Sequence, residues 1–162
     1  MNASEKLVNA WLQSKGYFTA TNIPCGKGQE IDILAVKPKD NDMIHVEVHV
    51  SVKPVGPVAR SREYANDSFG QRITNIVEHS FTAKRKFVIE RFGSDRYRLV
   101  HVRSKRIVKQ DMSLEDLKHE FLKHDVELVY IENILVDLMK DLKGRSFDET
   151  MNFVQLFKEF GS

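Results

Sequence analysis

Two short apolar segments separated by a polar turn constrain the fold of this chain more than any other feature. Residues 31–36 form a nearly unbroken apolar run that contains one acidic residue, Asp32. Residues 44–50 alternate between apolar and polar side chains, as a half-buried β-strand does. The residues between them, 37–42, have the composition of a turn. The sequence therefore predicts two antiparallel strands joined by this turn.

The predicted pairing of these strands brings two acidic side chains together. If Val36 pairs with Met43 across the turn, the antiparallel register puts Asp32 opposite Glu47. Directly opposed side chains in such a pair have Cβ atoms about 4.5–5.5 Å apart. Two carboxylates that close repel each other unless a positive charge compensates, and a divalent cation is the simplest candidate. We therefore predict that Asp32 and Glu47 bind Mg²⁺ or Mn²⁺.

Two further oxygen donors lie close to this pair in the sequence. The backbone carbonyl of Val48 is placed to be a third metal ligand. Glu30 lies on the same strand face as Asp32, two residues earlier. It is either a reserve metal ligand or a residue that contacts the ligands without binding the metal itself.

The same motif resembles the core of the PD-(D/E)XK nuclease superfamily, in which an acidic residue in one strand is followed by Glu-x-Lys in the next. Here Gly-x-Glu-Ile-Asp-Ile-Leu-Ala precedes Val-Glu-Val-His, which is most similar to the Holliday-junction-resolvase-like branch. The resemblance covers residues 4 to 100, approximately. It implies a restriction-endonuclease-like α/β fold, with a central mixed β-sheet flanked by helices. It also implies a metal-dependent endonuclease that hydrolyses phosphodiester bonds in DNA, structured or branched DNA included, and a homodimer by analogy with resolvases.

The sequence departs from the family pattern at one position, where His49 replaces the motif lysine. A neutral imidazole could accept a proton from the attacking water near pH 7, and a protonated one could supply positive charge. The missing cation could instead come from Lys53, or from Arg72 or Lys84 in the next predicted helix. His49 could equally ligate a softer metal such as Mn²⁺. A lone histidine in a strand is, however, more often structural. Loss of the lysine leaves open a catalytically inactive nuclease-fold domain that binds nucleic acid or mediates protein assembly.

Residues 2–15 are predicted to form an amphipathic helix, in which Leu7 and Trp11 recur at helical spacing. Asn2 followed by Glu5 three residues later is a capping-box-like start. Glu5 therefore has two interpretations. It is either a capping side chain or, as the resemblance implies, the helix glutamate that helps to hold metal-bound water at the catalytic site.

Basic residues are concentrated in one part of the chain. Residues 84–109 contain ten Lys or Arg against two acidic residues, whereas residues 110–162 contain six against twelve. This segregation predicts one basic face able to meet phosphates and a separate acidic region. Residues 52–62 are predicted to be an exposed basic loop. The predicted contacts to the DNA backbone are Lys53, Arg60, Arg62, Arg72 and Lys84.

The remaining pattern predicts a mixture of strands and helices. The predicted strands are residues 17–23, 86–91 and 97–103, with turns or loops at 24–28 and 93–95. The predicted helices run from residue 68 or 69 to 86, from Ser113 onward, over 136–142 and over 149–160. Periodicity does not decide whether 127–135 is a strand or the start of a helix.

The composition is that of an ordinary globular protein, with 41% hydrophobic and 30% charged residues. We expect one domain over residues 1–162, with a core over about 4–105 and a helical C-terminal extension over about 111–162. The single cysteine, Cys25, excludes an internal disulfide and fits a cytoplasmic protein. No apolar run approaches the roughly 20 residues that span a membrane, so we expect no membrane association.

Overall fold

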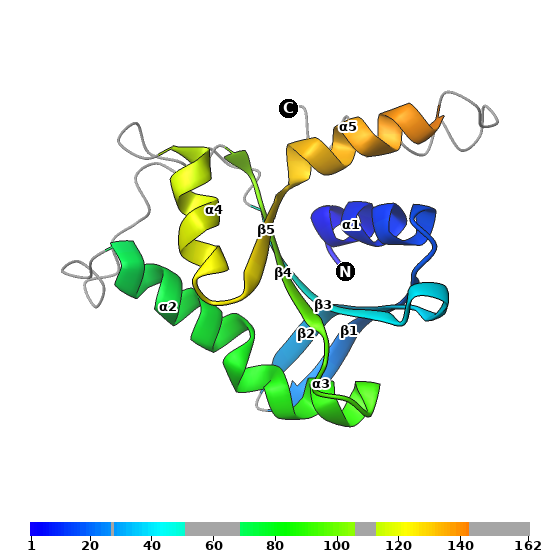
Figure 1. The fold of residues 1–162 in the computed structure, drawn as a ribbon. Coiled ribbons are helices and arrows are strands. Elements are labelled where there is room, and N and C mark those ends of the chain that lie inside the picture. The colour runs from blue at the N-terminus through cyan, green and yellow to red at the C-terminus, as the bar shows by residue number, and fades with distance from the viewer. Residues whose placement is uncertain (27, 51–68, 106–112, 143–162) are drawn as a thin grey trace.

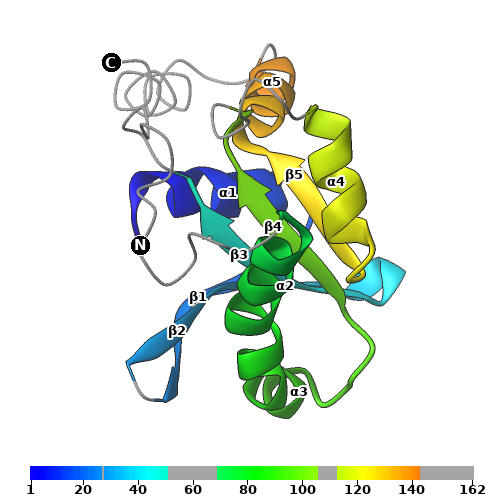
Figure 2. The same cartoon turned by 90° about the vertical axis from the view of Figure 1, so that its left-hand side faces the viewer.

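The computed structural model describes residues 1–26, 28–50, 69–105 and 113–142. These residues form an α/β fold in which a five-stranded mixed sheet is flanked by helices on both faces (Figures 1 and 2). The predicted class, a central mixed sheet covered by helices, is therefore confirmed. Within the described ranges, none of the helices has the length and apolar character needed to span a membrane.

The strands lie in the sheet in the order in which they occur in the chain. They are β1 (Phe18–Gly26), β2 (Gln29–Lys37), β3 (Asp42–His49), β4 (Arg98–Arg103) and β5 (Val126–Tyr130). β1, β2 and β3 are antiparallel neighbours, whereas β3–β4 and β4–β5 are parallel. Parallel neighbours need a long crossover connection, and helices lie between each parallel pair along the chain.

The helices form a layer on each side of the sheet. α1 (Ala3–Ser14) and α5 (Ile131–Leu142) contact each other on one face (Figure 1). α2 (Phe69–Ser80), α3 (Arg85–Phe92) and α4 (Leu114–Leu122) cover the other face (Figures 1 and 2). Two short 3₁₀ helices, η1 (Pro38–Asp40) and η3 (Thr82–Lys84), lie between longer elements.

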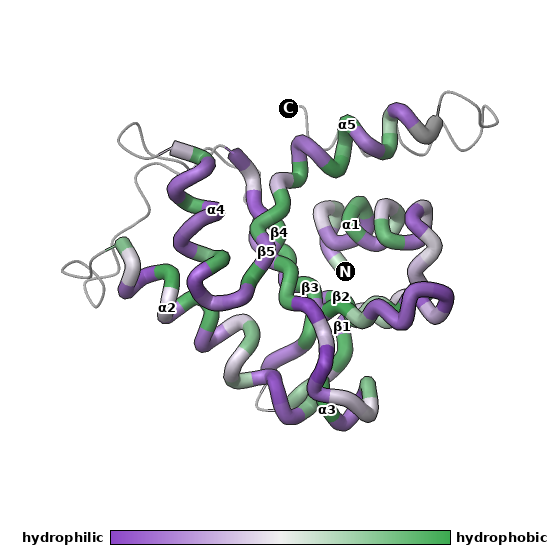
Figure 3. Tube along the Cα trace, viewed as in Figure 1, coloured by the Kyte–Doolittle hydropathy of each residue, from purple (hydrophilic) through white to green (hydrophobic). Residues whose placement is uncertain are grey.

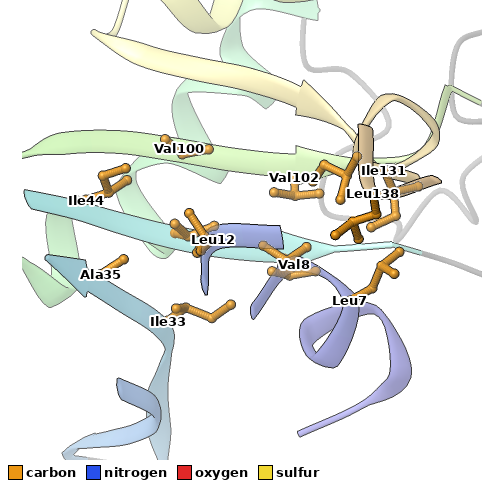
Figure 4. Packing of buried hydrophobic residues seen from close by; sticks show 13 residues of the cluster. Leu7, Val8, Leu12, Ile33, Ala35, Ile44, Val100, Val102, Ile131 and Leu138 are labelled. Atoms are coloured by element: carbon orange, nitrogen blue, oxygen red, sulfur yellow. The ribbon is translucent and has the colours of Figure 1, made fainter. Parts of the chain in front are cut away.

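Alternation along the central strands gives the two faces of the sheet different characters. The face under α1 and α5 carries an apolar cluster, and Figure 4 shows its side chains meeting those of α1. Its buried members in the strands are Ile33, Ala35, Ile44, Val46, Val48, Val100 and Val102. Figure 3 shows hydrophobic residues gathered along the central strands, while the helices alternate between hydrophobic and hydrophilic residues. The opposite face carries a second apolar cluster between α2, α4 and β5, and polar groups beside it.

The predicted register of the first two central strands is confirmed. Val36 pairs with Met43, and pairing continues to Ile33 and Val46. The turn between the strands contains η1, after which Asn41 adopts a left-handed conformation with φ of 49°. Asparagine tolerates this conformation better than most residues.

Two predicted local structures are wrong. Pro24, Cys25 and Gly26 continue β1 rather than forming a loop, and Gly26 pairs with Gln29. Residues 86–91 form α3 rather than a strand. Consecutive apolar residues fit either element, and packing decides here because Val88 is buried against the β1–β2 pair.

Other boundaries are partly as predicted. The helix that begins at Phe69 ends at Ser80 rather than near residue 86. Residues 127–135 contain both alternatives, since β5 ends at Tyr130 and α5 begins at Ile131. The capping boxes at Asn2 and Ser113 are confirmed. The predicted basic loop at 52–62 and helix at 149–160 lie outside the described residues.

Candidate functional site

Asp32 lies where the pairing of β2 and β3 ends. The backbone ladder stops at Ile33 and Val46, so Asp32 and Glu47 are the next positions in the same register. There the Oδ2 atom of Asp32 accepts a hydrogen bond of 2.7 Å from the backbone N–H of Val48. The carboxylate thus takes the place of a strand carbonyl as the acceptor. The structure therefore brings Asp32 to β3 beside Glu47.

Glu47 is buried, with 6% of its surface exposed, and both of its carboxylate oxygens have donors. Its Oε1 atom lies 2.7 Å from Nε2 of His45, and its Oε2 atom lies 2.5 Å from Nζ of Lys84. Each carboxylate oxygen has two lone-pair positions, so each retains one acceptor position.

Lys84 is predicted from the sequence to contact DNA phosphates, but it is buried, with 6% of its surface exposed. The reason is local. α2 ends at Ser80, the buried Phe81 follows, and the tighter turns of η3 direct Lys84 toward the sheet. A buried ammonium group is stable only with a partner, and Glu47 is that partner. Lys84 was also one of the three candidates for the missing cation, and it is the one found beside Glu47.

The electrostatic environment of Asp32 disfavours its negative charge. Burial, followed by repulsion from Glu47, raises the pKa of Asp32 to about 6, although the Val48 N–H and Lys84 oppose the shift. The charge of Glu5 adds a smaller upward contribution. The charged form of Asp32 is therefore disfavoured even with the ammonium group of Lys84 nearby.

Glu5 is a capping residue, and its charge also acts on the site. It is buried, accepts the backbone N–H of Asn2 at 2.9 Å, and its own N–H donates to Oδ1 of Asn2 at 3.0 Å. The side chain of Asn22 lies between Glu5 and Glu30, at 3.4 Å and 3.3 Å. Glu30 is exposed at this position. The role of Glu5 in holding metal-bound water stays a prediction.

His49 ends β3 on the polar face, two residues after Glu47. Its side chain is exposed, and its register partner in β4 is Arg103. Partial desolvation and the charge of Arg103 lower the pKa of His49, so the imidazole is neutral near pH 7. Within the described residues, no hydrogen bond joins His49 to either carboxylate.

Two buried histidines on the same face were not predicted to have a role. His45 is 0% exposed and contacts Glu47. His101, the register partner of Glu47 in β4, is 1% exposed and stacks on Phe121. Strand alternation placed His45 on the polar face, but only the position of α2 shows that this face is buried.

Of the other predicted DNA contacts, the structure describes one and leaves three outside the described residues. Arg72 lies in α2 and is half-buried. Lys53, Arg60 and Arg62 lie outside the described residues.

The donor set suits one kind of metal ion. Among the described residues, no group of three or more His, Cys, Asp or Glu side chains could hold a metal ion. A closed zinc site needs four such ligands, whereas Mg²⁺ keeps several waters and binds through one or two carboxylates plus substrate phosphates. In Asp32, Oδ2 accepts the bond from Val48, which leaves Oδ1 for a cation. Asp32 and Glu47 are thus the described residues whose carboxylate oxygens could hold a hydrated Mg²⁺ or Mn²⁺.

A scan against models of known protein families found no match to this sequence, and a search of curated proteins found no significant match.

The raised pKa of Asp32 predicts a pH-dependent effect of Asp32→Asn in metal-free protein. The folded state holds the proton more tightly than the unfolded state, so this contribution to stability is present at low pH and is lost as pH rises through about 6. Asparagine keeps an acceptor for the Val48 N–H but has no charge. We expect the free energy of unfolding of the variant, relative to wild type, to increase by about 1 kcal/mol between about pH 5 and about pH 8.

Urea unfolding of both proteins at the two pH values measures this difference. Asp95→Asn, at an exposed position, is the matched control and should show no such change. The same difference between wild type and Asp32→Asn at both pH values would show that the charge of Asp32 is not disfavoured.

The Glu47–Lys84 pair predicts strong coupling between two substitutions. Lys84→Met leaves a buried carboxylate without its ammonium partner, so we expect a loss of about 3 kcal/mol or more. The double variant Glu47→Gln with Lys84→Met removes both charges and should recover most of that loss, as measured by urea unfolding. Additive effects of the two changes would contradict a buried ion pair.

Proposed function

We propose that this chain is a metal-dependent nuclease of the PD-(D/E)XK type that hydrolyses phosphodiester bonds in DNA. The observation that carries the proposal is the carboxylate pair in which half-buried Asp32 has a pKa raised to about 6 beside a buried Glu47 that is bound by Lys84. Such a combination of desolvation and specific charged neighbours is typical of functional sites.

The order of the elements supports the same proposal. A helix precedes three antiparallel strands, and a crossover helix then leads to a parallel strand. The two acidic residues lie on the second and third of these strands, as in the motif that the sequence resembles.

Phosphodiester hydrolysis needs an activated water and stabilisation of negative charge on the phosphate oxygens. A bound Mg²⁺ would supply that charge stabilisation and lower the pKa of a bound water. Asp32 and Glu47 would hold the ion through carboxylate oxygens. The Nζ atom of Lys84 supplies the positive charge that the motif lysine provides in the family, from a different element of the fold.

His49 would then act as a general base and would not replace the positive charge of the motif lysine. Its imidazole is neutral near pH 7, so an unprotonated ring nitrogen can accept the proton of the attacking water. We propose DNA as the macromolecular partner and a homodimer as the assembly. Phosphate contacts would come from Arg72 and from the segment that contains Lys53, Arg60 and Arg62.

One observation favours a second candidate, a nuclease-fold domain that binds nucleic acid without cleaving it. Lys84 neutralises Glu47 without any metal ion, and the described residues hold no larger cluster of ligands. Such a domain would bind DNA with an affinity that falls steeply with salt, and it would cleave none in any metal.

Cleavage assays separate the two candidates. Supercoiled, single-stranded and four-way-junction DNA are incubated with the protein in Mg²⁺ and in Mn²⁺. We expect cleavage that needs the metal and that falls by about a hundredfold or more in Asp32→Asn and in Glu47→Gln, since each variant loses a charged ligand.

The exposed Asp95→Asn variant controls for the loss of one negative charge and should cleave at the wild-type rate. Salt-sensitive binding of these DNA molecules with no cleavage would favour the binding domain. Cleavage unchanged in both ligand variants would place the active site elsewhere.

A further inference from the structure

Two buried imidazoles lie on the polar face of the central sheet, and only one of them contacts a carboxylate. His45 and His101 occupy the neighbouring strands β3 and β4, and each is at most 1% exposed. The Nε2 atom of His45 lies 2.7 Å from Oε1 of Glu47. Both ring nitrogens of His101 are without a hydrogen-bond partner among the described residues. Burial alone therefore does not explain why His45 reaches Glu47.

The bond between His45 and Glu47 fixes the tautomer of the imidazole. Glu47 is paired with Lys84 and is a carboxylate, so Nε2 of His45 must carry the proton and donate it. Nδ1 of His45 is buried without a partner in the described part of the chain. A hydrogen on Nδ1 would be an unpaired buried donor, which is costly. The geometry therefore assigns the ring hydrogen to Nε2, where it meets the Oε1 atom of Glu47.

Aromatic neighbours hold this ring in one orientation. Phe81 packs edge-on against His45, with centroids 5.0 Å apart and an interplanar angle of 70°. Tyr97 lies on it at a centroid distance of 6.5 Å. These side chains come from the segments after α2 and before β4, so the position of the ring depends on both crossover segments.

The two donors to Glu47 restrain its carboxylate differently. Lys84 reaches Oε2 through a long stem with several rotatable bonds, which can adjust when a cation arrives. His45 reaches Oε1 from a rigid ring on the same strand, two residues away. The restraint from His45 therefore persists when Lys84 shifts.

We propose that His45 is a positioning residue, which holds the carboxylate of Glu47 in the orientation needed for a metal ligand through the Nε2–H···Oε1 bond. This inference rests on the proposed role of Glu47 as a ligand. It differs from a purely structural role, in which His45 fills space between Phe81 and the sheet. Groups that orient a metal ligand in this way contribute about 10- to 100-fold to metal affinity.

Matched variants test the inference through Mn²⁺ affinity, measured by calorimetry on the full chain, and through DNA cleavage. His45→Phe keeps a ring against Phe81 but removes the donor, and we expect both quantities to fall by about tenfold or more. His45→Gln keeps an N–H donor and should recover part of the loss. His101→Phe replaces a buried imidazole that does not contact Glu47, and it should change neither quantity by more than about twofold. Equal behaviour of His45→Phe and His101→Phe would overturn the inference.

A second measurement distinguishes failure of this inference from failure of the proposed function. ¹⁵N NMR of the metal-free wild type should show His45 protonated at Nε2 alone, with an Nε2–H signal that shifts in Glu47→Gln. A ring protonated at Nδ1, or a signal that Glu47→Gln does not move, would overturn the positioning role. The expected signal in a protein that neither binds Mn²⁺ nor cleaves DNA would support the His45–Glu47 restraint and refute the nuclease.

Discussion

The buried ion pair between Glu47 and Lys84 is the interaction on which the rest of the site depends. Both side chains are about 8% exposed, so each charge needs the other. The pair joins β3 to η3, the turn that follows α2, and so ties the crossover segment to the centre of the sheet. His45 binds the second oxygen of the same carboxylate and packs on Phe81, which lies in the same crossover. One carboxylate therefore binds both an ammonium group and an imidazole, and through them it links β3 to the crossover segment.

The same strands that carry this polar cluster also build the apolar core. Val46 and Val48 point toward α1 and α5, while His45 and Glu47, which alternate with them, point toward α2. The last paired residues of the β2–β3 ladder are Ile33 and Val46. Asp32, the neighbour of Ile33 in the chain, is therefore free to turn its carboxylate toward β3. A well-packed apolar layer on one face thus holds charged groups in place on the other, where burial, followed by repulsion from Glu47, raises the pKa of Asp32.

The sequence predicted those features that depend on local pattern. Strict alternation and turn composition predicted the Val36–Met43 register, and from it the proximity of Asp32 and Glu47. Side chains three residues apart predicted the capping boxes. Burial of Lys84 and the helical state of 86–91 depend on tertiary packing, because they follow from where α2 ends and from the contact of Val88 with β1 and β2. The buried contact of His45 with Glu47 also depends on tertiary packing. Sequence alone does not predict it, because a histidine on the polar face of a strand is ordinarily exposed. The expected contribution of Lys53, Arg60 and Arg62 stays a prediction.

We propose that the carboxylates of Asp32 and Glu47 form a pair whose negative charge a divalent cation would stabilise. Titration of the Asp32 carboxyl by ¹³C NMR, with and without saturating Mg²⁺, tests it most directly. The account predicts a midpoint at a pKa of about 6 without metal and a clearly lower midpoint with Mg²⁺, because the cation favours the ionised carboxylate. A midpoint at the ordinary value of an aspartate, about 3.9, in both conditions would contradict it.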